Sequence, residues 1–111
     1  MLTAIQLTDE SGRWFDSGLS TRIAERTWFD GNNHISANTG SQWSHEALWH
    51  TRKGTWILEE SSGHSDHYKI IDEEEAVRWI SHNDAISDEQ ISNLPADTQA
   101  RLREQFKGFE I

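Results

Sequence analysis

Cysteine is absent from the chain, proline occurs once and basic residues are scarce, and each shortage excludes a class of protein. Without cysteine there is no disulfide and no thiolate metal site. No apolar run approaches the roughly 20 residues that a membrane-spanning helix needs. Residues 1–10 have neither a basic region nor a long apolar stretch, so they do not resemble a secretion signal. We therefore expect a cytoplasmic protein that does not enter a membrane.

Charge is distributed very unevenly along the chain. The sequence has 19 acidic residues against 10 lysines and arginines, a formal net charge of −9. Between Glu59 and Asp97 the only bases are Lys69 and Arg78, and the whole acidic excess lies in this stretch. Such a field repels nucleic-acid backbones and attracts basic surfaces. We expect no direct binding of nucleic acid, and a basic partner surface, that of a nucleic-acid-binding protein. The simpler alternative is that the acids keep a small protein soluble.

The length of 111 residues suits one domain, residues 1–111. Strand-like segments and turns fill the first two-thirds, and helical patterns fill the last third. This segregation is typical of an α+β fold. We expect an antiparallel sheet of four or five strands in the N-terminal two-thirds. One main helix covers one face of this sheet, and short helices follow at the C-terminus.

The expected strands are separated by glycine- and asparagine-containing turns. The residues expected to turn the chain tightly are Asp30-Gly31-Asn32-Asn33 and Arg52-Lys53-Gly54. Residues 8–18 are expected to form a loop, with Trp14 and Phe15 returning to the core. The strand candidates are residues 2–7, 22–29, 34–38, 41–51, 55–59 and 67–71, and four or five strands are expected in the sheet. Alternation along residues 41–51 places Trp43, His45, Ala47 and Trp49 on one face and Ser44, Glu46, Leu48 and His50 on the other.

Capping signals mark the helices. Asp72 precedes Glu75 by three residues, which is the spacing of a capping box and predicts a helix over residues 72–83. Ser87 and Gln90 repeat that spacing and predict a second, short helix. A third helix is expected from about residue 95 to 107. Its apolar stripe is narrow, so we expect it at the rim of the core.

A scattered acid–base set is the candidate catalytic group: His34, His45, Glu46 and His50. A His/Glu pair on adjacent strands can carry out general acid–base chemistry, as in a small hydrolase or a ribonuclease toxin. The alternative is that these groups bind loop backbone beside the tryptophans. The run from His45 to His50 is one residue too long for a zinc-protease motif, and on a strand its two histidines face opposite ways.

Metal and cofactor signals are weak. Residues 63–67 place two histidines and an aspartate in a loop, which can chelate a metal but is equally a solvated connector. The glycines at positions 31 and 40 match no phosphate-binding or dinucleotide pattern. We expect no cofactor and no metal.

The six tryptophans are several times more than a chain of this length ordinarily carries. Trp43, Trp49 and Trp56 are expected on neighbouring strands, where they can stack across a hairpin. Core packing is one interpretation of this aromatic content. The other is an exposed patch, because tryptophan is enriched where proteins bind one another.

The candidate partner-binding residues combine acids of the helical region with two of these rings. They are Glu73, Glu74, Glu75, Asp84, Asp88, Glu89, Trp43 and Trp49. Carboxylates at helical spacing can imitate a row of phosphates. The alternative is that they cap the helix and face water, since the first turn of a helix favours negative charge.

One stretch resembles a group of small uncharacterised bacterial proteins. The residues that carry the resemblance are Trp28 to Ser36, Thr39 to Trp43, His45-Glu46, and Gly54 with Trp56. The resemblance covers about residues 26–80. It implies a shared surface or turn geometry in residues 30–43, and no activity.

Together these features favour a non-catalytic protein-binding module. The sharper expectation is an acidic inhibitor, comparable to phage anti-defence (anti-CRISPR-like) or antitoxin-like factors, that occupies a basic nucleic-acid-handling surface of its partner. The alternative is the His/Glu-dependent hydrolase or ribonuclease toxin. The sequence leaves the oligomeric state open.

Overall fold

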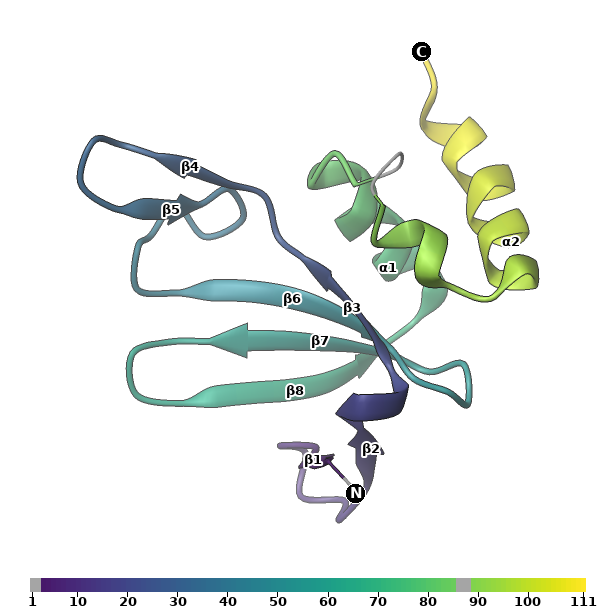
Figure 1. Cartoon of the computed structure of the whole chain (residues 1–111), viewed down its shortest axis with the longest axis horizontal. Coiled ribbons are helices and arrows are strands. Elements are labelled where there is room, and N and C mark those ends of the chain that lie inside the picture. Colours follow the sequence, from purple (N-terminus) through teal and green to yellow (C-terminus); the bar gives the residue numbers. More distant parts are fainter. Residues whose placement is uncertain (1–2, 86–88) are drawn as a thin grey trace.

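A four-stranded antiparallel sheet forms the centre of the protein in a computed structural model that describes residues 3–85 and 89–111. Its strands lie in the order β3-β6-β7-β8 (Figure 1). Their bounds are β3 (Thr21–Ala24), β6 (His45–His50), β7 (Trp56–Ser61) and β8 (Asp66–Ile71). The predicted α+β class and the antiparallel sheet are confirmed.

A two-stranded N-terminal hairpin covers one face of this sheet. Strand β1 (Ala4–Gln6) pairs with β2 (Trp14–Asp16), so the prediction of a loop throughout residues 8–18 is wrong at β2. A short 3-10 helix, η1 (Ser17–Leu19), follows. Phe15 returns to the core as expected and packs with Trp49 and Ile57, whereas the same expectation for Trp14 is wrong, because its ring stays half exposed. The sheet therefore has a layer on each face, because the alternation along β6 sends Trp49 away from the helices and that ring also needs cover.

The helices cover the other face. Helix α1 (Glu73–His82) begins where predicted, and the Asp72 carboxylate accepts a hydrogen bond from the Glu75 backbone N–H at 2.8 Å. Helix α2 (Ala96–Phe106) follows Pro95 and lies between the 3-10 helices η2 (Ile91–Asn93) and η3 (Lys107–Phe109). The Leu102 side chain is fully buried in the main core, so the rim position expected for α2 is wrong. The predicted cap at Ser87 lies outside the described residues. Within the part of the chain that is described, no helix is long and apolar enough to cross a membrane.

A second two-stranded hairpin projects from the sheet between β3 and β6. The single strand predicted over residues 22–29 is in fact split, because the chain leaves the sheet at Glu25 and starts β4 (Thr27–Phe29), which pairs with β5 (His34–Ser36). Figure 1 shows this hairpin extending from the sheet on the side away from α2. Trp43, expected within a long strand, lies in the loop before β6. We call residues 27–43 the aromatic arm.

Candidate functional site

The root of the aromatic arm is held by one carboxylate that sequence analysis overlooked. The Glu25 side chain is almost fully buried and accepts three hydrogen bonds. The donors are the Ser36 hydroxyl at 2.6 Å, the Glu46 backbone N–H at 2.8 Å and the His45 Nδ1–H at 2.5 Å. Because Ser36 belongs to the arm and the other two donors to β6, Glu25 ties the arm to the sheet.

His45 is an anchoring group in this arrangement. Its Nδ1 contacts Glu25 and its Nε2 lies 2.9 Å from the Gln42 carbonyl oxygen. Both partners are acceptors, so the ring satisfies them best as an imidazolium that donates from each nitrogen. The hydrogen bond to Glu25 raises the pKa of His45, burial opposes this, and the Gln42 carbonyl adds to the rise. With both nitrogens engaged, neither is free to take a proton from a substrate.

The other three members of the acid–base set lie in separate environments. Glu46 projects toward the helices and accepts a hydrogen bond from the Trp79 indole N–H at 3.1 Å. His50 is buried on that same face with its ring edge-on to Trp56, and burial, followed by the Arg101 charge, lowers its pKa. His34 is exposed on the arm beside the Phe29 ring. The fold therefore does not gather the four residues into one cleft.

The aromatic arm carries the most exposed rings of the described protein. Trp28 is 55% exposed, Phe29 60% and Trp43 70%. Every residue of β4 is exposed, whereas Ile35 opposite Trp28 is buried. Sequence analysis proposed Trp43 but missed Trp28 and Phe29. Their adjacency is a usable signal: neighbouring rings point to opposite faces of a strand, and both can be buried only if the strand has a layer on each side.

The tip and base of the arm are closed by local hydrogen bonds. The predicted turn at Asp30 is confirmed: its carboxylate accepts from the backbone N–H groups of Asn32 and Asn33, both at 2.8 Å. These bonds lower the pKa of Asp30. Gly31 has a φ of 107°, which favours glycine. At the base, the Ser36 hydroxyl accepts from the N–H of Thr39 at 3.1 Å. The rings are thus displayed on a constrained backbone.

The remaining tryptophans correct the expected stacking across a hairpin. Trp49 and Trp56 lie on opposite faces of the sheet and pack in different clusters. Trp49 is buried against Phe15, and its indole N–H donates to Glu59 at 2.8 Å. Of the two rings proposed for partner binding, Trp43 is thus on the surface, and Trp49 is in the core.

Several of the proposed partner-binding acids already have basic neighbours. Glu73 pairs with Arg101 at 3.3 Å, and Glu74 pairs with Arg78 at 2.5 Å. Asp84 pairs with Arg26 at 2.6 Å. Glu75 and Glu89 are exposed, and Asp88 lies outside the described residues. Pairing with bases of the same chain weakens the negative field around the Glu73 and Glu74 carboxylates.

The histidine-containing loop is a polar connector between β7 and β8. Its Ser62 N–H donates to the Ser65 carbonyl at 2.9 Å, and the Ser65 hydroxyl lies 3.3 Å from His67 Nε2. Within residues 3–85 and 89–111, no three or more His, Asp or Glu side chains are placed to hold a metal ion.

Comparison with known proteins adds no relative to this description. No protein-family model, curated protein or solved structure matches the chain. The candidate function therefore rests on the geometry of the molecule itself, and the feature in which that geometry departs most from an ordinary surface is the aromatic arm.

Proposed function

We propose that the protein is a non-catalytic protein-binding module and that the aromatic arm is its contact surface. The observation that supports this is the exposure of Trp28, Phe29 and Trp43 on one projecting segment. Exposed aromatic side chains leave apolar area in water, and a segment that exposes several of them is a candidate contact site. Tryptophan is also enriched among the few residues that carry most of the energy of an interface.

The anchored root of the arm also supports a role in binding. Glu25 holds Ser36 and His45, so the arm is joined to the sheet at both of its ends. A segment that is already ordered loses less conformational entropy when a partner binds it. The arm therefore presents its rings to a partner without first having to fold.

The chemistry of the partner follows from the charge beside the arm. A groove of about 450 Å³ runs from Asn38 at the base of the arm to α1. Its lining includes Glu46 and Glu75 together with Arg78 and His82, and Arg78 is already paired with Glu74. The protein as a whole carries a net charge of −9. A partner with an apolar pocket bordered by lysine or arginine complements both features. The finer proposal is an acidic inhibitor, anti-defence or antitoxin-like, that occupies a basic nucleic-acid-handling surface.

The experiment is a comparative capture from a bacterial lysate, followed by affinity measurement with the purified partner. The baits are the wild type, Trp28→Ala, Trp43→Ala and the matched control Phe109→Ala, whose half-exposed ring lies on η3. We expect the wild type and the control to retain the same protein and both arm variants to lose it. Each arm substitution should weaken binding by about thirtyfold or more, as for a hot-spot residue.

Two results would count against the proposal. Equal affinity of the wild type and both arm variants would remove the arm as the contact surface. A salt titration tests the charge of the partner separately, because screening weakens attraction between charges and leaves apolar contacts intact. An affinity that is the same at low and high salt would contradict a basic partner surface. The proposal that the arm is the contact surface would not be affected.

A further inference from the structure

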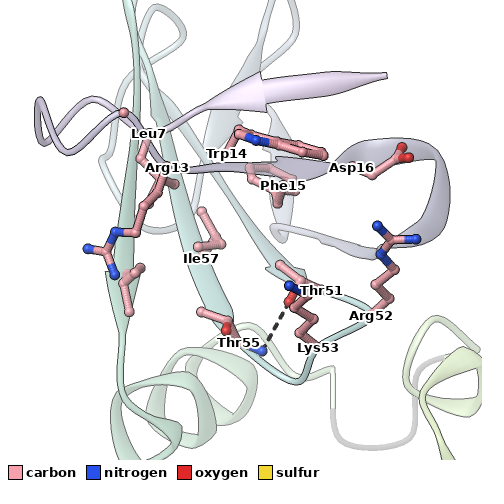
Figure 2. A pocket seen from close by; sticks show the side chains of 12 residues that line it. Leu7, Arg13, Trp14, Phe15, Asp16, Thr51, Arg52, Lys53, Thr55 and Ile57 are labelled. Atoms are coloured by element: carbon pink, nitrogen blue, oxygen red, sulfur yellow. Dashed lines mark hydrogen bonds between the residues drawn. The ribbon is translucent and has the colours of Figure 1, made fainter. Parts of the chain in front are cut away.

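A hollow of about 470 Å³ lies between the N-terminal hairpin and the turn that joins β6 to β7, well separated from the aromatic arm. Figure 2 shows Trp14 and Phe15 of β2 along one side, Ile57 of β7 in the middle, and Arg52 and Lys53 on the turn opposite. Leu7 and Ile70 complete its apolar lining. Trp14 also lines the hollow, and its ring is half exposed.

The two basic residues of this hollow differ from most others in the protein. Seven of the ten lysines and arginines form an ion pair within 4.0 Å. Within the described residues, Arg52, Lys53 and Arg103 form none. In a chain with so large an excess of acid, two neighbouring cations outside any close ion pair leave a local positive site, although the charge of Arg52 also acts on the nearby Asp16 carboxylate.

The turn that presents these cations is well ordered. The Thr51 N–H donates to the Thr55 carbonyl at 2.9 Å, and the Gly54 N–H donates to the Thr51 carbonyl at 2.9 Å. The Thr51 hydroxyl accepts from the Thr55 N–H at 3.1 Å, the bond drawn in Figure 2. Gly54 has a φ of 88°, which closes the turn. The backbone positions of both basic residues are therefore set before any ligand arrives.

We propose that this hollow binds a small ligand that joins a planar ring to a phosphate, namely a nucleoside monophosphate. Its volume falls within the range of small-ligand pockets. A base can stack on the open part of the Trp14 ring, since indole rings accept any base through its π face. Arg52 and Lys53 supply the charged donors that phosphate oxygens prefer.

The local charge limits the ligand to a small anion. Arg13, at the other end of the hollow, is already paired with Asp9 at 3.2 Å. Asp16 also lines the hollow, and its carboxylate accepts from the Thr3 hydroxyl at 2.7 Å and the Gly18 N–H at 3.0 Å. The Thr3 hydrogen bond keeps the pKa of Asp16 low, so this carboxylate offsets one of the two free cations. That balance suits one phosphate and repels a nucleic-acid strand.

The test is a titration of the full chain with AMP, followed by NMR of backbone amides and by calorimetry. The variants are Arg52→Ala/Lys53→Ala and Trp14→Leu, and the matched control is Arg103→Ala, which removes an unpaired arginine from α2. We expect AMP to shift the amides of Trp14, Arg52 and Lys53. Each pocket variant should weaken AMP binding by about tenfold or more, and the control should not change it.

Titrations with the two halves of the ligand are the comparisons that can overturn the proposal. Adenosine and inorganic phosphate should each bind at least tenfold more weakly than AMP, since each uses one side of the hollow. Benzoate of equal affinity would assign the site to aromatic carboxylates, contrary to the proposal. Absence of AMP binding at millimolar concentration, or full binding by the Arg52→Ala/Lys53→Ala variant, would also reject it. None of these results depends on whether the aromatic arm binds a protein.

Discussion

The central sheet and the aromatic arm are both antiparallel and both carry tryptophan, yet they treat these rings in opposite ways. In the sheet, Trp49 and Trp56 point to opposite faces and both are buried, because a hairpin covers one face and the helices cover the other. In the arm, Trp28 and Phe29 also occupy consecutive positions of a strand, and both remain exposed. Strand alternation decides the side to which a ring points, and the presence of a second layer decides whether it stabilises the fold or is open to a partner.

The largest expected effect lies in the sheet. Leu48 is fully buried at its centre, paired with Ile23 and Leu58. Leu48→Ala should lower the free energy of unfolding by about 2–5 kcal/mol, because it removes buried methyl groups and leaves a cavity. Trp28→Ala in the arm should change it by less than about 0.5 kcal/mol, as at an ordinary surface position. Urea denaturation measures both, and equal losses would mean that the arm is packed like the sheet.

A substitution at Glu25 should have a smaller effect on stability, and it should loosen the arm more than the sheet. Glu25→Gln removes the charged acceptor shared by Ser36, His45 and the Glu46 N–H, and should cost about 1–3 kcal/mol. Hydrogen exchange should accelerate in residues 27–43 more than in β6, β7 and β8. The control Glu75→Gln alters an exposed carboxylate on α1. Uniform acceleration throughout the sheet would show that the arm and the sheet open as one unit.

His45 should make the free energy of unfolding depend on pH. Its pKa is raised in the folded state, so protonation favours folding. The stability that it adds relative to His45→Gln should be complete below pH 6.5, its ordinary pKa, and should disappear as pH rises through the raised value. Urea denaturation of both proteins from pH 5 to 9 measures this, at roughly half-unit steps. A difference that grows with pH would contradict the assigned anchor.

His50 should respond in the opposite direction, although it lies on the same strand. Burial lowers its pKa, so the folded state resists protonation, and stability should be lost as pH falls from 6.5 through the lowered value. His50→Phe keeps a ring against Trp56 and removes the titration. The variant should therefore lose less stability than the wild type in acid. This is the smallest expected effect, and thermal melts at paired pH values measure it.

Local signals in the sequence were enough to place the turns, the helix start and the faces of β6. Asp72 and Asp30 act on backbone groups within three residues of themselves, so their roles could be predicted from spacing. The same holds for Leu48 and Trp49, whose opposite directions follow from strand alternation. These features depend on neighbouring residues alone.

Features that depend on distant residues could not be predicted in this way. Glu25 directly follows β3, and its partners Ser36 and His45 lie 11 and 20 residues further along the chain. Strand β2 has only three residues, in a polar stretch, and its place is set by the uncovered Trp49 face. The candidate site shares this limitation: which tryptophans are exposed depends on which strands receive a covering layer.

The topology has a further consequence for how such a protein can change. Ala24 of β3 pairs with Ala47 of β6, so the whole arm is a connection within what would otherwise be a plain hairpin. The entropic cost of a connection grows slowly with its length, about 0.6 kcal/mol for each doubling. The turn at the tip of the arm, which is closed by local hydrogen bonds, can thus be lengthened or replaced at little entropic cost. Changes there would vary the proposed contact surface and leave the scaffold unchanged.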